Sequence, residues 1–62
     1  MSYKIVYNEE GNILASVPPD ANVEAVKTNW PGSNHITVEK ELDFKYWIYF
    51  RVNPTTQQLE RI

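Results

Sequence analysis

The chain has no cysteine, only two glycines and a single histidine among its 62 residues. Without cysteine it can form no disulfide, and one histidine cannot build a histidine-based structural metal site. Two isolated glycines do not make the glycine-rich loops that hold phosphate groups. No apolar run approaches the roughly 20 residues needed to cross a bilayer. We therefore expect no metal, no cofactor and no membrane partner.

The chain also lacks a strong excess of either charge, because it has six basic and eight acidic residues and a net charge of −2. Such a chain is a poor candidate for binding along a phosphate backbone. No basic segment followed by an apolar one marks a secretory signal. We expect one domain over residues 1–62, soluble in the cytoplasm. A core this small is often supplemented by oligomerisation.

Two short strands and a turn are predicted at the start of the chain. Residues 3–7 and 13–17 have strand composition, and the segment between them contains Gly11 and Asn12. Both residues tolerate the positive φ that a hairpin with a bulge requires. Pro18 and Pro19 cannot donate to a sheet and end the second strand.

A helix is predicted over residues 21–30. The Asp20 carboxylate can cap its first turn, and the Pro31-Gly32 pair ends it. Its apolar stripe consists of Val23, Val26 and Trp30. A helix this short depends on packing against a sheet for its stability.

The second half of the chain predicts three further strands, over 35–39, 44–52 and 57–61, with an Asn53-Pro54 turn before the last. The fold class is therefore α+β with the order ββαβββ. An antiparallel sheet of four or five strands carries one short helix on one face and leaves the other face free. The predicted core is Ile5, Ile13, Val17, Val23, Val26, Trp30, Ile36, Val38, Ile48, Phe50 and Leu59.

The predicted strand 44–52 carries five of the eight aromatic rings. On a strand its even positions would face the core, and the amphipathic odd positions would face outward. These outward candidates for protein binding are Lys45, Trp47, Tyr49 and Arg51. Alternatively, Trp47 and Tyr49 pack over one another and shield the sheet. A third hypothesis is that the rings stack on single-stranded nucleic acid, which the net charge disfavours.

Catalytic residues are sparse. His35 is the one conventional base near neutral pH, and no serine lies in a recognisable nucleophile motif. An exposed histidine at the start of a strand is the simpler interpretation. Glu39, Glu41 and Asp43 alternate, but the ligand spacing of a calcium loop is absent. We expect a protein that is not an enzyme.

The function predicted from these features is a non-enzymatic protein-interaction module, which binds another protein or a second copy through a sheet face or an edge strand. The alternative is a small inhibitor of a host protein that acts through an acidic face. That face would consist of Glu9, Glu10, Asp20 and Glu24.

Two segments carry a resemblance to a known class. Residues 3–17 contain a strand, an acidic-Gly-Asn turn and a return strand, and residues 50–62 contain a strand, an Asn-Pro-Thr-Thr turn and a polar strand. This layout resembles small proteins encoded by phages and prophages of Gram-positive bacteria. The resemblance implies a virion component or an accessory protein in the host cytoplasm, neither catalytic. Turn motifs specify no functional residues.

Overall fold

The computed structural model describes residues 2–62, which fold into two antiparallel sheets, one α-helix and one 3-10 helix. The first sheet has the strand order β2-β1-β3, and the second pairs β4 with β5. The elements in chain order are β1 (Tyr3–Tyr7), β2 (Ile13–Val17), α1 (Val23–Lys27), β3 (Asn34–Val38), the 3-10 helix η1 (Phe44–Tyr49), β4 (Phe50–Asn53) and β5 (Gln58–Arg61).

The predicted β1–β2 hairpin is confirmed, including its bulge. The pairing shifts between Val6 and Tyr7, so that Leu14 is the extra residue of β2. The Asn8 side-chain oxygen accepts from the amides of Glu10 (3.0 Å) and Asn12 (2.9 Å) and holds the turn. Gly11 has a φ of 89°, which a glycine adopts without steric cost.

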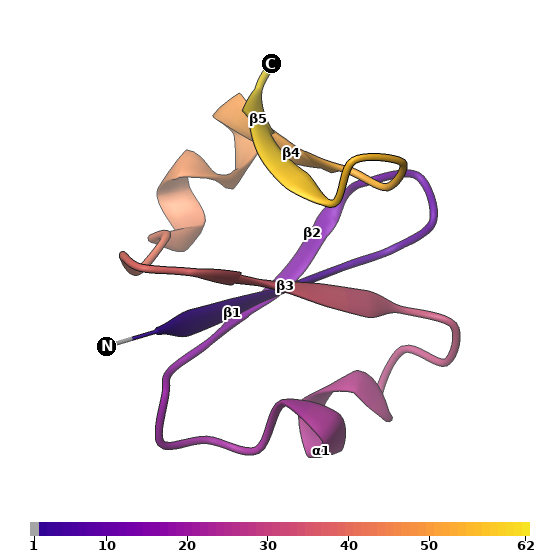
Figure 1. Cartoon of the computed structure of the whole chain (residues 1–62), viewed down its shortest axis with the longest axis vertical. Coiled ribbons are helices and arrows are strands. Elements are labelled where there is room, and N and C mark those ends of the chain that lie inside the picture. Colours follow the sequence, from indigo (N-terminus) through magenta and orange to yellow (C-terminus); the bar gives the residue numbers. More distant parts are fainter. Residues whose placement is uncertain (1) are drawn as a thin grey trace.

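Strand β1 is the centre of the fold, and both of its faces are buried. Ile5 and Tyr7 belong to one cluster with Val52 of β4, and partly buried side chains from β3 pack against them. Val6 faces the other way and clusters with Val17 and Val23 of α1. Figure 1 shows α1 on one side of the three-stranded sheet and η1 with the β4–β5 hairpin on the other.

The expectation of a single sheet with one free face is therefore wrong. Residues 44–49 leave the extended conformation, so β4 and β5 form a separate hairpin that covers the face opposite α1. The amide of Val52 donates to the carbonyl of Gly11 (3.0 Å) and joins this hairpin to the β1–β2 turn. The strand predicted over 44–52 is correct only from Phe50 to Val52, and β4 continues to Asn53.

The helix is shorter than predicted and begins later. Asn22, not Asp20, is the N-cap, and its side-chain oxygen accepts from the Glu24 amide (3.0 Å). After Lys27 the chain continues in tighter turns, in which the Trp30 amide donates to the Lys27 carbonyl (3.0 Å). These turns rotate Trp30 away from the stripe that Val23 begins.

The predicted core is largely confirmed on the first sheet and wrong in two places. Trp30 is 37% exposed and Ile48 is 72% exposed, because each lies in a 3-10-like turn instead of the predicted regular element. The sequence-based list also omitted three buried residues, namely Val6, Tyr7 and Val52. Val6 was missed because β1 is buried on both faces and does not alternate, whereas Tyr7 shares the face of Ile5.

Candidate protein-interaction surface around the 3-10 helix

The 3-10 helix η1 is capped at its start by Asp43 and directs one side chain, Trp47, inward. The Asp43 carboxylate accepts from the Lys45 amide (3.3 Å), and the Asp43 carbonyl accepts from the Tyr46 amide (2.9 Å). The Trp47 indole lies half-buried and donates from Nε1 to the Leu42 carbonyl (3.1 Å). These bonds turn the chain through η1 and direct Trp47 toward β2, where Leu14 and Ala15 line the same hollow.

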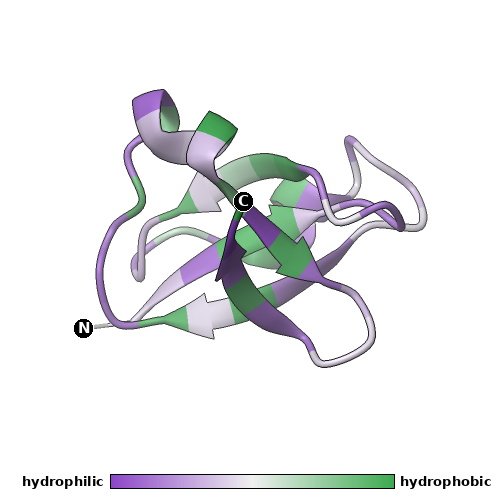
Figure 2. Cartoon of the chain, turned by 90° about the horizontal axis from the view of Figure 1, so that it is seen from above, coloured by the Kyte–Doolittle hydropathy of each residue, from purple (hydrophilic) through white to green (hydrophobic). Residues whose placement is uncertain are grey.

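The remaining large apolar side chains of η1 point into solvent. We call this group, together with the last residue of the chain, the η1 surface. Its members are Phe44, Tyr46, Ile48, Tyr49 and Ile62, all of which are exposed. Ile62 belongs with them because its amide donates to the Tyr49 carbonyl (2.8 Å). Figure 2 shows this short helix at the edge of the molecule, next to the C terminus.

The η1 surface contains an apolar groove of about 300 Å³ between η1 and β5. Tyr46 and Tyr49 form one wall, which follows from the three-residue repeat of a 3-10 helix. Phe50 and Arg61 complete the lining. The Lys45 ammonium lies 5.2 Å from the centre of the Tyr46 ring, so a cation borders the groove as well. Exposed tyrosines beside arginine are typical of interface anchors.

The four predicted binding residues do not share one face. Tyr49 belongs to the η1 surface and Lys45 borders it beside the Tyr46 ring, but Trp47 faces inward. Arg51 points to the β1–β2 turn, where its Nη2 donates to the Glu10 carbonyl (3.4 Å). Sequence reasoning placed Tyr46 and Ile48 on the core side, because it applied strand alternation to residues that form a 3-10 helix. The one local signal for that helix was Asp43, a residue type that commonly caps the first turn of a helix by accepting from the amide two residues later.

The proposed acidic face is divided by the fold. Glu9 and Glu10 lie in the β1–β2 turn, whereas Asp20 follows the opposite end of β2. Five strand residues separate these ends, which corresponds to roughly 16 Å. Glu24 lies on α1 with one carboxylate oxygen 3.8 Å from the Lys27 ammonium. The four carboxylates therefore do not form one continuous surface.

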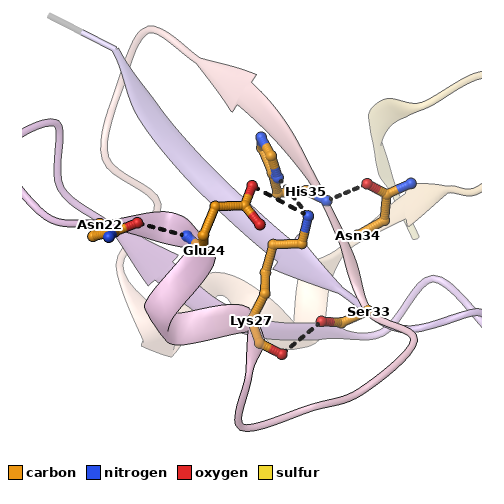
Figure 3. A network of polar contacts seen from close by, with 6 residues as sticks. All are labelled: Asn22, Glu24, Lys27, Ser33, Asn34 and His35. Atoms are coloured by element: carbon orange, nitrogen blue, oxygen red, sulfur yellow. Dashed lines mark hydrogen bonds and ion pairs between the residues drawn. The ribbon is translucent and has the colours of Figure 1, made fainter.

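His35 belongs to a polar network that joins β3 to α1 (Figure 3). Its Nδ1 lies 3.2 Å from the Lys27 ammonium, which donates to the neutral imidazole. Burial lowers the pKa of His35 below its ordinary 6.5, and the charge of Lys27 lowers this pKa further; Glu24 opposes the shift and Lys4 adds to it. The Ser33 hydroxyl donates to the Lys27 carbonyl (3.5 Å) instead of to His35. The network therefore positions α1 against the sheet.

Residues 2–62 contain no group of three His, Asp or Glu side chains arranged to hold a metal ion. Within the same residues, no helix has the length and apolar character to cross a membrane. Comparison of the chain with protein-family models, with curated proteins and with solved structures found no match in any of the three. The candidate site is therefore inferred from the structure of this chain alone.

Proposed function

We propose that the chain is a non-enzymatic protein-interaction module that self-associates through the η1 surface. The observation that carries the proposal is the exposure of Phe44 (74%), Ile48 (72%) and Ile62 (75%) on or beside a single six-residue helix. A soluble monomer rarely exposes more than a few hundred Å² of contiguous apolar surface.

The exposed area is of the size that a symmetric pair requires. Three of the five side chains of the η1 surface are aromatic, and an aromatic side chain can bury roughly 150–250 Å². With exposed fractions between 46% and 75%, the five side chains together expose on the order of 500 Å² per chain. Two copies would bury on the order of 1,000 Å², the lower limit for a specific interface.

Two further features favour a second copy as the partner. The border of the η1 surface carries both signs of charge, with Asp43 at the N-cap of η1 and Lys45 and Arg61 beside the groove, so it can complement itself under a twofold axis. The core of the described chain is also small, with six buried hydrophobic residues. Association stabilises such a small domain by mass action.

Static light scattering over a concentration series tests the proposal. The wild-type molar mass is expected to rise from that of a monomer to that of a dimer with concentration. Ile48→Glu places a charge in the apolar interface and is expected to keep the protein monomeric. Ala25→Glu introduces the same charge at an exposed position of α1, on the opposite side of the sheet, and is expected to dimerise like the wild type. A wild-type monomer at every concentration would refute self-association.

A further inference from the structure

A second site lies away from the η1 surface, in a cleft of about 490 Å³ between the β1–β2 turn and the turn that follows α1. This volume is within the range of small-ligand pockets. Glu9 and Glu10 contribute from the first turn and Trp30 from the second, while Leu14 supplies an apolar part of the lining. The cleft thus combines an aromatic ring with two carboxylates.

Both walls of the cleft are held by hydrogen bonds. On one side, Asn8 closes the β1–β2 turn by accepting from two amides through its side chain and from the Gly11 amide through its carbonyl (2.9 Å). On the other side, the Trp30 carbonyl accepts from the Ser33 amide (3.0 Å). The backbone of both turns is therefore fixed before any ligand arrives.

The carboxylates of this cleft are free of cationic partners within residues 2–62. Arg51 approaches the same turn but donates to the main-chain carbonyl of Glu10, not to its carboxylate. One Glu9 oxygen lies 4.0 Å from the position that a Cβ on Gly32 would occupy. The negative charge of Glu9 therefore lies near the turn that carries Trp30.

We propose that the cleft binds an arginine side chain of a protein partner. A guanidinium is planar, so it can stack on the exposed Trp30 ring while its edges donate to Glu9 and Glu10. A lysine ammonium would satisfy the charge but neither the stacking nor the paired donors. The 3-10-like turn after α1 leaves Trp30 37% exposed, so part of its ring is accessible to such a ligand.

The test is an NMR titration of the ¹⁵N-labelled protein with the capped peptide acetyl-Gly-Arg-Gly-amide at low salt. We expect saturable shifts of the Trp30 indole N–H and of the amides of Glu9, Glu10 and Gly32. The same peptide with citrulline in place of arginine keeps the shape without the charge and is expected to bind at least tenfold more weakly. The lysine peptide is expected to bind about threefold more weakly or worse, for lack of stacking.

Variants separate the two components of the site. The exposed pair Glu9→Gln and Glu10→Gln, combined in one chain, is expected to weaken binding about tenfold and to leave the rest of the spectrum unchanged. Trp30→Leu is expected to weaken it about threefold. Tyr49→Ser, in the η1 surface, serves as the matched control and is expected to bind like the wild type. Absence of shifts in the cleft, equal binding of citrulline or lysine, or an unaffected double glutamine variant would overturn the assignment.

Discussion

The β1–β2 hairpin and the 3-10 helix η1 have similarly apolar sequences, yet one forms the core and the other faces solvent. In the hairpin, alternation and turn chemistry act together, and Ile5 and Val6 are fully buried. In η1 a denser run of aromatic residues begins at a capping aspartate, and Ile48 is mostly exposed. The difference shows that local geometry decides which apolar residues become core.

The sharpest way to test this comparison is to truncate an isoleucine to alanine in each region. Ile5→Ala removes a fully buried side chain beside Tyr7 and Val52 and is expected to lower the free energy of unfolding by about 2–5 kcal/mol. For a domain this small, that loss can abolish folding. Ile48→Ala is expected to change it by less than about 0.5 kcal/mol.

Urea denaturation followed by fluorescence measures both variants, at protein concentrations low enough to keep the chain monomeric. Equal losses in the two variants would mean that Ile48 is buried and that the contrast between the regions is wrong.

The next effect comes from the contact that joins the hairpin to β4. A Cβ on Gly11 would overlap the carbonyl oxygen of Val52, and the glycine has a positive φ. Gly11→Ala is therefore expected to cost at least about 2 kcal/mol of unfolding free energy, from strain and displacement of β4. Gly32 has a similar φ of 87° but open space around it. Gly32→Ala is expected to cost about 1 kcal/mol, and thermal unfolding of both variants would show whether the order holds.

A smaller effect is expected within η1, where one ring faces inward and its neighbour faces outward. Trp47→Phe removes the hydrogen bond to the Leu42 carbonyl and is expected to lower the unfolding free energy by about 1 kcal/mol. Tyr49→Phe keeps the exposed ring and is expected to leave this free energy unchanged within about 0.5 kcal/mol. Urea midpoints distinguish the two. A neutral Trp47→Phe would show that the indole bond does not hold the helix.

The smallest effect is the pH dependence of stability that arises from His35, which contacts Lys27 of α1 from strand β3. The pKa of His35 is lower in the folded chain than in the unfolded chain. As the pH falls below 6.5, the unfolded chain therefore binds a proton at His35 before the folded chain does. The free energy of unfolding should therefore be highest above pH 6.5 and fall as the pH drops below it. His35→Gln should lose this dependence.

Urea midpoints of the wild type and of His35→Gln at pH 7.5 and 5.5 provide the measurement. The wild type should lose more stability than the variant across this range. Identical losses would mean that burial and the charge of Lys27 do not lower the pKa of His35 in the folded chain.

The sequence predicts the elements whose causes are local. Strand β3, the β5 strand and the Asn53 turn follow from alternation and turn residues, and the Asn53 side chain accepts from the amides of Thr55 (2.9 Å) and Thr56 (3.3 Å). The arrangement of the two sheets could not be read in the same way. It depends on the contact between Val52 and Gly11, which are far apart in the sequence.

The candidate site was located only in part for the same reason. Tyr49 and Lys45 were predicted as binding residues, and the structure places Tyr49 on the η1 surface and Lys45 at its border. Ile62 was missed because its link to Tyr49 is a backbone hydrogen bond without a sequence pattern. The cleft near Trp30 was missed because two turns from distant parts of the chain form it.

The central claim is that the chain binds a second copy through the η1 surface, which consists of Phe44, Tyr46, Ile48, Tyr49 and Ile62. Amide shifts in ¹⁵N-labelled protein, recorded from micromolar to millimolar concentration, test it most directly. The account predicts concentration-dependent shifts at these residues and constant shifts in β1 and β2. Shifts that stay constant throughout, or that change mainly in the β1–β2 hairpin, would contradict it.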